Sequence, residues 1–316
     1  TSGCLSKPRI FWLTRVCIES AAVVLVLLIH HRLHYIDQYY KFTNLIGGLG
    51  AAPTADWLES PVMQQYFAYD YSGPAFELFG TGHLVYLALM VVAIAILVWG
   101  WRDPSDTAKN RVRLLIASIM LVNEVAWHAW NLGTGAWSVR ENLPLHLCGI
   151  SIWSTIYMLL YRDYRLYPII FFVGLGGAAQ AIITPSAGEY GLPHFRAFQT
   201  LISHGMLVIA IVFLAAIEGR RPTWLSLWKT MLMLNVYLVA VTAINYALGS
   251  NYMFTMQKPH TASLFDVMGP WPWYLLWAEV LAVILFAALY LPFALSDRRL
   301  RPQPVRSPGD SRAGSA

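Results

Sequence analysis

Charged residues are scarce in this sequence of 316 amino acids, of which only 12% are Asp, Glu, Lys or Arg. A soluble domain ordinarily carries about 25% charged residues, which cover its water-facing surface. At the same time 57% of the residues are apolar, which excludes an intrinsically disordered chain, because such chains are poor in apolar residues. The composition therefore predicts a protein that folds in a membrane.

Cysteine is also scarce, with only Cys4, Cys17 and Cys148 in the whole chain. Three cysteines so far apart exclude a disulfide framework and a CxxC metal site. The sequence also lacks the GxSxG, HExxH, P-loop and dinucleotide-binding motifs of common enzyme families. Any thiol chemistry therefore depends on a single cysteine.

Long apolar runs are abundant. A helix needs roughly 17–25 mostly apolar residues to cross a bilayer, and we find eight such runs. They predict an all-α, polytopic transmembrane helix bundle, with a seven-helix core and one N-terminal anchor helix. The expected spans lie near residues 10–30, 80–101, 112–131, 144–161, 166–184, 198–217, 228–248 and 272–295.

The basic residues indicate how this bundle is oriented, because cytoplasmic loops carry an excess of Lys and Arg. If both termini lie in the cytoplasm, 17 of the 22 Lys and Arg residues fall on the inner side. The exceptions are Arg32, Lys41, Arg140, Arg196 and Lys258. We therefore predict an N-in and C-in topology.

Four segments follow from this topology. Residues 1–31 form an anchor helix that is expected to stay in place, because no small-residue cleavage site follows it. Residues 32–79 are rich in aromatic residues and are expected to form an outer interfacial loop. Residues 80–296 form the seven-helix catalytic or binding core, and residues 297–316 form a basic, disordered cytoplasmic tail.

Polar groups concentrate at one end of the predicted bundle. All nine histidines fall at the outer ends of helices or in outer loops. Ionisable groups within membrane helices often mark function, because placing them in lipid is costly. Glu124 and His128 are four residues apart and share one helix face. With Gln180 and Asn245 near the outer ends of two other helices, they predict a shared polar cavity.

Polar and small residues also have a structural interpretation, since they hold membrane helices together. Gly174 and Gly177 are suited to close packing of their helix against a neighbour. Asn235 and Thr242 lie deeper in the bilayer than the other polar residues of their helix. For these two residues we favour a packing role.

Cys148 belongs to the most informative motif, which runs from Glu141 to Cys148. Asn142 is suited to cap a helix and Pro144 to its first turn, so Cys148 is expected one turn inside the outer end. There the positive end of the helix dipole favours a thiolate. His146 lies on the opposite face of an ideal helix, which makes it a poor partner for the thiol.

The base that would serve Cys148 has two candidates. His204 is expected at nearly the same depth in the membrane. His128, oriented by Glu124, is the competing choice. Against both stands the interpretation that Cys148 is an inert buried residue, which is the usual state of cysteines in protein interiors.

Several short motifs are spread through the core. They are Phe79-Gly-Thr-Gly-His83-Leu, Leu143-Pro-Leu-His146-Leu-Cys148, GGAAQAIITP at 176–185, Arg221-Pro222, Asn245 with Asn251-Tyr252-Met253, and PWPWY at 270–274. Together, from about residue 76 to 295, they resemble the YwaF-like family of bacterial integral membrane proteins. The first helix and the long loop are additions to the seven-helix core of that family.

That family is distantly similar to an animal transmembrane acyltransferase of ether phospholipids. The resemblance implies that a cysteine at the position of Cys148 carries an acyl group. It also implies that a histidine at the position of His204 assists the cysteine. We therefore expect a lipid acyltransferase or lipid hydrolase that uses a thioester intermediate at the outer leaflet.

This hypothesis assigns a role to each candidate residue. The expected catalytic residues are Cys148, His204, His128 and Glu124, and the expected substrate-binding residues are His83, His146, Gln180, Asn245, Asn251, Tyr252, Arg140 and Arg196. The expected partners are the bilayer and a phospholipid or lysophospholipid, with no cofactor, metal or nucleic acid. The expected location is a bacterial plasma membrane.

Two alternatives remain open. Imidazole and thiolate groups suit zinc, copper or haem iron, so His83, His128, His146 and His204, with Cys148 as a possible fifth ligand, would make a metal or haem site. A small-molecule permease or sensor is the third interpretation. It would need polar residues in the inner halves of the helices, where apart from Asn235 there are almost none.

Overall fold

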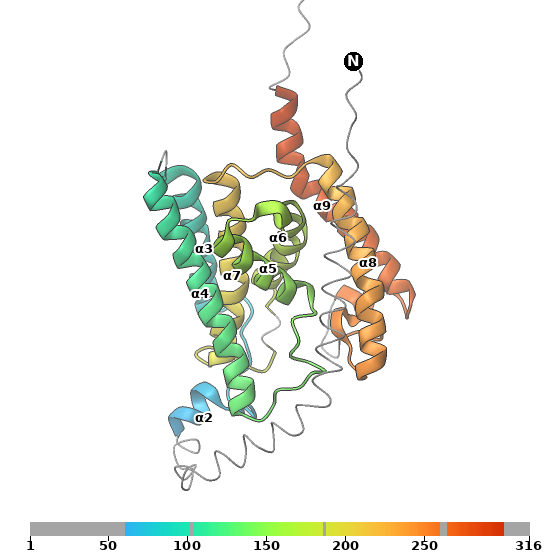
Figure 1. Ribbon diagram of the computed structural model, residues 1–316. Coiled ribbons are helices and arrows are strands. Elements are labelled where there is room, and N and C mark those ends of the chain that lie inside the picture. Colours follow the sequence, from blue (N-terminus) through green and yellow to red (C-terminus); the bar gives the residue numbers. More distant parts are fainter. Residues whose placement is uncertain (1–60, 102–103, 186–187, 260–263, 300–316) are drawn as a thin grey trace, which may run out of the picture. The chain divides into compact units, whose positions relative to one another are not determined.

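The computed structural model describes residues 61–101, 104–185, 188–259 and 264–299, and in these ranges the chain is helical and has no strand. The prediction of an all-α polytopic bundle is confirmed (Figure 1). The chain divides into two compact units, Thr1–Gln64 and Gln65–Ala316, and the second unit contains helices α3 to α9. The predicted anchor helix at 1–31 and the tail beyond Arg299 lie outside the described residues.

The seven expected core spans all occur as helices, and six of them are long and apolar enough to cross a membrane. The seventh, α5, has only 15 residues and coincides with the shortest predicted span. The helices are α3 (Thr81–Ala95, continued by the π-helix Ile96–Gly100), α4 (Asp106–Gly133), α5 (Leu147–Tyr161), α6 (Tyr167–Ile183), α7 (Phe195–Ala216), α8 (Trp224–Leu248) and α9 (Trp273–Arg299).

Short helical pieces complete the described chain. They are α2 (Pro61–Phe67), which falls within the expected outer loop, and the 3-10 turns Tyr164–Leu166, Tyr252–Phe254 and Leu264–Met268. The segment after α2 is held to the loop before α7, because Gly191 N donates to the Pro74 carbonyl (3.0 Å). A Cβ at Gly191 would overlap that carbonyl oxygen, so glycine is required for this close approach.

The core of the bundle is centred on α6 and α7. Phe172 of α6 and Phe213 of α7 are fully buried, whereas the outer helices expose large apolar side chains such as Trp99 and Val239, each at 71%. Such exposure is expected of helices that face lipid, where apolar side chains need no cover. Helices α6 and α7 therefore lie in the interior, and the helices that carry Trp99 and Val239 face lipid.

Glycines allow α6 to approach its neighbours closely. A Cβ at Gly174 would lie 3.0 Å from Ile211 Cδ1 of α7, and one at Gly176 would lie 3.0 Å from Leu285 Cδ2 of α9. These distances are tighter than an ordinary van der Waals contact. The packing role predicted for Gly174 is confirmed.

Asn235 also has the packing role that we favoured, since its amide donates to Glu279 Oε2 of α9 (3.0 Å). Thr242 does not link two helices. Its hydroxyl donates to the Leu238 carbonyl of its own helix (2.7 Å), a common way for Thr to satisfy its hydroxyl within a helix.

Candidate functional site

Cys148 is the second residue of helix α5. The helix begins at Leu147, and the side chain of its N-cap residue His146 makes no capping hydrogen bond. The first N–H groups of a helix have no acceptor within the helix. Cys148 therefore lies among backbone donors that the helix itself does not use.

The expected start of this helix was wrong by three residues. Leu145 N bonds to the Leu143 carbonyl (2.7 Å) in a tight turn, so Pro144 precedes the helix. The Asn142 side chain accepts from Ser138 N (2.8 Å) and organises the preceding loop instead of capping the helix. Cys148 is consequently closer to the helix end than the sequence indicated.

Tyr252 anchors the loop that leads into α5. Its hydroxyl donates to the Val139 carbonyl (2.8 Å) and accepts from Leu143 N (2.9 Å). Burial raises the pKa of Tyr252 to about 12, so the hydroxyl stays protonated and can donate. Tyr237 adds a third bond to this loop, since its hydroxyl donates to the Leu145 carbonyl (3.0 Å).

Asn245 in turn holds the turn that carries Tyr252. Its Nδ2 donates to the Tyr252 carbonyl (2.8 Å) and Thr255 Oγ1 (2.9 Å), and its Oδ1 accepts from Ser250 Oγ (2.7 Å) and Tyr252 N (2.9 Å). An amide side chain has two donor hydrogens and one oxygen with two acceptor sites, so all are occupied. Asn245 and Tyr252, expected as substrate-binding residues, are therefore both engaged in positioning the loop before Cys148.

A cavity of about 640 Å³ opens beside this loop. It brings together four of the expected substrate-binding residues: Arg140, His146, Asn245 and Asn251. Cys148 does not line it. The sequence missed the other lining residues, which are Glu141, Tyr246, Gly249, Ser250, Phe254, Met256 and Gln257.

Two of these residues shape the cavity through contacts on its wall. His146 Nδ1 accepts a hydrogen bond from Met253 N (3.2 Å), and burial lowers the pKa of His146, so the ring is neutral at pH 7. Asn251 Oδ1 accepts from Met256 N (3.1 Å) and Gln257 N (3.2 Å). The Asn251 side chain thus maintains a turn of the cavity wall.

His204 has the tautomer that a general base requires. Its Nδ1 lies 2.8 Å from the Thr200 carbonyl. Because a carbonyl only accepts, Nδ1 carries the proton and the neutral ring has its lone pair on Nε2. His204 makes no hydrogen bond to Cys148 among the described residues.

His128, the competing base, has the opposite tautomer. Trp137 Nε1 donates to its Nδ1 (3.1 Å), which leaves the proton of the neutral ring on Nε2. The expectation that Glu124 orients His128 was wrong, because the bond that orients the ring comes from Trp137. The buried Glu124 side chain instead lies within electrostatic range of Arg196 of α7.

Arg196 takes part in a polar row along α7. Its Nη1 donates to Gln199 Oε1 and Thr200 Oγ1, both at 2.5 Å, and its guanidinium lies over the Trp127 ring at 4.1 Å. Arg196, which was expected to bind substrate, is half-buried against its own helix.

The polar row on α7 continues toward α4. Gln199 Nε2 donates to Ser203 Oγ (3.0 Å), and Asn123 Nδ2 donates to the same hydroxyl (2.7 Å). The sequence did not single out Gln199, Ser203 and Asn123. The i, i+3 and i+4 spacing of positions 196, 199, 200, 203 and 204 was the signal that could have revealed the row.

Cys148 packs against α6. A Cβ at Gly177 would lie 3.5 Å from Cys148 Sγ, so the glycine leaves room for the thiol. Ser151 and Thr155 follow Cys148 on the same face of α5 and are fully buried. Neither hydroxyl has a hydrogen-bond partner in the described ranges. These two residues were also missed.

The other candidate residues have structural contacts. His83 accepts from Phe79 N (3.1 Å) and its Nε2 lies 2.9 Å from the Ile182 carbonyl, which joins α3 to α6. Both ring nitrogens are therefore occupied. The side chain of Gln180 is exposed.

His194, one of the histidines placed at the outer end of the bundle, does not face water. It is fully buried at the N-cap of α7. Its Nδ1 accepts from Arg196 N (3.1 Å), and its Nε2 donates to the Ala68 carbonyl (3.0 Å). His260 lies outside the described residues.

The metal alternative receives no support from the geometry. No three His, Cys, Asp or Glu side chains of the described chain lie close enough to share a metal ion.

Comparison with known proteins identifies the family of this chain. A model of the TMEM164 family matches residues 78–290, which is more than half of the chain. The chain belongs to the TMEM164 family. No curated protein and no solved structure matches it. The part that matches the TMEM164 family extends from just before α3 into α9 and contains Cys148 and His204.

Proposed function

We propose that this membrane protein transfers or hydrolyses the acyl groups of phospholipids through a thioester on Cys148. The observation that carries the proposal is the position of Cys148 as the second residue of a helix with an uncapped N-terminus. Helix N-termini stabilise negative charge. Both the thiolate and the oxyanion of an ester under attack carry such a charge.

The first step would form the thioester. His204 Nε2 takes the thiol proton, Cys148 Sγ attacks the ester carbonyl, and a tetrahedral oxyanion forms. First-turn amides of α5 are suited to stabilise that oxyanion. The ester C–O bond then breaks, and the protonated His204 returns the proton to the leaving lipid oxygen, which becomes a hydroxyl.

The second step would release the acyl group. A lysophospholipid hydroxyl or a water molecule gives its proton to His204 and attacks the thioester carbonyl. The C–S bond breaks, the Cys148 thiolate leaves, and His204 returns the proton to it. No cofactor enters either step. The hydrogen bonds of His204 Nδ1 and His128 Nδ1 support His204 as the base, because they leave a lone pair on Nε2 of His204 and a proton on Nε2 of His128.

The cavity beside the loop that leads into α5 would receive the lipid headgroup. Exposed Arg140 lies on its wall with neutral His146 and the Asn251 turn. A guanidinium and neutral polar groups suit a phosphate that carries one negative charge. The proposal includes a phospholipid as acyl donor and a lysophospholipid or water as acceptor. It also places the chain in a bacterial YwaF-like subgroup and in a bacterial plasma membrane.

The test is acyl transfer to the purified protein in detergent. Incubation with an acyl-labelled phospholipid should place label on the wild type that hydroxylamine removes. Cys148→Ala should abolish this label, and His204→Gln should slow its appearance by roughly 10²–10⁴-fold, the usual effect of losing a general base. His128→Gln is the matched control and should retain most of the rate.

Two outcomes would contradict the thioester. Label that survives in Cys148→Ala would show that another residue accepts the acyl group. An unlabelled wild type that contains stoichiometric zinc or haem would favour the metal alternative instead.

A further inference from the structure

Three arginines gather at the other end of the bundle, far from Cys148. Arg113 belongs to α4, Arg162 is the C-cap of α5, and Arg220 follows α7. All three lie within electrostatic range of the Tyr164 hydroxyl, and the Arg220 guanidinium stacks over the Tyr164 ring at 4.3 Å. We call these three residues the arginine cluster.

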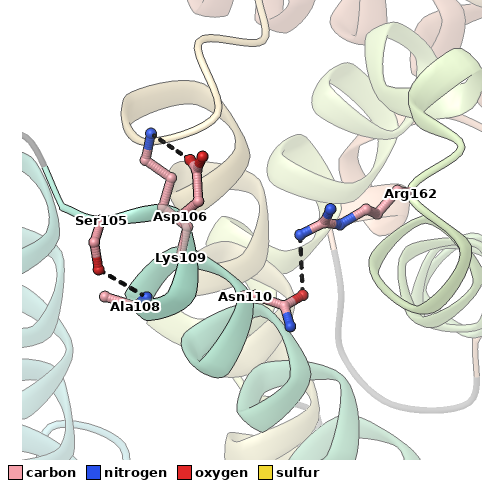
Figure 2. Close-up of polar contacts among 6 residues, drawn as sticks. All are labelled: Ser105, Asp106, Ala108, Lys109, Asn110 and Arg162. Atoms are coloured by element: carbon pink, nitrogen blue, oxygen red, sulfur yellow. Dashed lines mark hydrogen bonds and ion pairs between the residues drawn. The ribbon is translucent and has the colours of Figure 1, made fainter.

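A neutral side chain joins two members of the cluster. Asn110 Oδ1 accepts from Arg113 Nη2 (2.6 Å) and from Arg162 Nη2 (3.0 Å), and Figure 2 shows Arg162 reaching across to Asn110 near the start of α4. Like charges repel, and an amide oxygen does not neutralise them. The arrangement therefore lacks an anion where two guanidinium groups meet.

Nearby carboxylates do not balance this charge. Among the described residues, Glu218 is the one acidic side chain within electrostatic range of the Tyr164 hydroxyl. Asp106 pairs with Lys109 (3.7 Å), as Figure 2 shows, and Asp163 pairs with Arg165 (3.6 Å). None of the arginines in the cluster forms an ion pair with a described residue, so three positive charges face one carboxylate.

Unused hydrogen-bonding groups occur in the same place. Arg113 is 5% exposed, and its Nε is buried without an acceptor among the residues that the structure describes. The buried hydroxyl of Tyr164 likewise has no partner there. A buried donor without an acceptor is destabilising, so these groups indicate a ligand that accepts several hydrogen bonds.

We propose that the arginine cluster binds a phosphate group. A phosphate has several acceptor oxygens, and guanidinium groups match its geometry with paired N–H donors. Buried Arg113 would form the floor of the site, while exposed Arg162 and Arg220 would close over its rim. A phosphate supplies both the missing negative charge and the missing acceptors.

The position of the cluster relates it to the membrane. Arg162 ends α5, and the apolar helix segment that contains α6 begins at Tyr164. The cluster therefore lies where membrane helices end, at the level of lipid headgroups. Basic pockets between helices on the cytoplasmic side commonly bind such headgroups. A soluble phosphate ester offers the same chemistry, and the experiment distinguishes the two.

This site is separate from the acyl-transfer site. Cys148 and Arg162 lie at opposite ends of α5, about 20 Å apart for a helix of this length. Phosphate binding at the cluster therefore does not depend on the thioester proposal, and each can fail alone.

The experiment measures thermal stabilisation of the purified full chain in detergent. The probes are dioctanoyl phosphatidic acid, dioctanoylglycerol as the phosphate-free analogue, and inorganic phosphate at constant ionic strength. The test variant is Arg162→Gln with Arg220→Gln, because both side chains are exposed and their loss should leave the fold intact. Arg165→Gln is the matched control, an exposed arginine at the same end of the bundle.

We expect phosphatidic acid to raise the Tm of the wild type and of Arg165→Gln. The double variant should need at least tenfold more phosphatidic acid for half of that shift. If inorganic phosphate gives the same variant-dependent shift at similar concentrations, the site takes a soluble phosphate. If phosphatidic acid acts alone, the site takes a lipid.

Three outcomes would overturn the proposal. The first is a wild-type Tm that neither phosphate probe raises. The second is a shift with dioctanoylglycerol as large as that with phosphatidic acid, because the acyl chains and not the phosphate would then cause it. The third is an equal loss in Arg165→Gln and in the double variant, which would indicate general attraction between charges.

Discussion

The histidines of this protein differ in what their ring nitrogens contact. These contacts determine which histidine can act as a general base. His83 and His194 use both nitrogens in bonds to the backbone. His128 accepts at Nδ1, whereas His204 donates there. Since the proton on one nitrogen leaves the lone pair on the other, His204 is the better base of the two at the outer ends of α4 and α7.

The pH dependence of stability should reveal the role of His194. Burial lowers its pKa below the ordinary value, although the bond to the Ala68 carbonyl acts in the other direction. The unfolded chain then binds a proton at a higher pH than the folded chain does, so stability falls as the pH drops below about 6.5. Thermal unfolding between pH 7.5 and 5 should therefore show a falling Tm.

His194→Asn isolates this contribution, because Asn is a good N-cap residue and does not titrate. The Tm of the variant should fall less than that of the wild type over the same pH range. Parallel curves for the two proteins would show that His194 does not contribute to the pH dependence.

Gly205 should be intolerant of even one added methyl group. A Cβ at this position would overlap the Tyr86 hydroxyl and lie 3.0 Å from Met90 Sδ. Tyr86 would have to give up its bond to the Leu201 carbonyl (2.8 Å). We expect Gly205→Ala to destabilise the fold by about 1–3 kcal/mol, as overpacking of a core does.

Gly133→Ala is the matched control for this prediction, because a Cβ added at Gly133 would meet no heavy atom within 4 Å. Alanine is favoured over glycine in helices by up to about 1 kcal/mol, so this variant should be neutral or more stable. Thermal unfolding in detergent measures both. Equal Tm values for the two variants would contradict the close contact between α3 and α7.

At the scale of elements, the turn at 250–257 and helix α8 determine where α5 begins. Tyr252 and Tyr237 bond to the loop before α5 at three backbone groups. Asn245 fixes Tyr252 in turn. Cys148 is thus positioned by residues that lie about a hundred positions later in the chain.

Tyr252→Phe should test this long-range anchoring. The ring keeps its packing, but Leu143 N and the Val139 carbonyl lose their partner, which should cost about 1–3 kcal/mol. Acylation of Cys148 should slow as the loop loses its anchor. Tyr161→Phe is the control, since Tyr161 is 72% exposed. A Tm drop as large in Tyr161→Phe would refute the specific role of Tyr252.

These contacts also explain which features the sequence could predict. Seven core helices follow from long apolar runs, since a bilayer leaves few other options for such segments. The start of α5 was misjudged because Pro144 is typical of a first turn, whereas the observed turn depends on tyrosines from elsewhere in the chain. Local patterns contain no information about such tertiary bonds.

The candidate site was predictable to a similar degree. The sequence singled out Cys148 and His204, and it identified four residues that line the cavity. It did not predict that Trp137 orients His128, or that the Arg196 guanidinium lies over the Trp127 ring. Both contacts bring together side chains whose orientation only the folded helices determine.

At the scale of the whole molecule, the orientation in the membrane remains a prediction from the basic residues. Glu189 lies in the loop before α7, and Thr107 lies at the start of α4, and both are exposed. In a background without the native cysteines, Glu189→Cys should react with a membrane-impermeant maleimide in intact cells. Thr107→Cys should react only after the cells are opened. The reverse labelling would invert the proposed topology.

The shortness of α5 has a consequence for the bilayer around it. Its 15 residues measure about 22 Å, whereas the hydrocarbon layer is about 30 Å thick. Arg162 keeps one end of the helix at the polar boundary, because a charged side chain is costly inside hydrocarbon. The thiol end must then lie several ångströms below the opposite boundary, or the lipid around it must thin to meet it. The ester linkages of phospholipids lie just beneath the headgroups. Local thinning of the leaflet would therefore bring these ester linkages to the depth of the Cys148 sulfur.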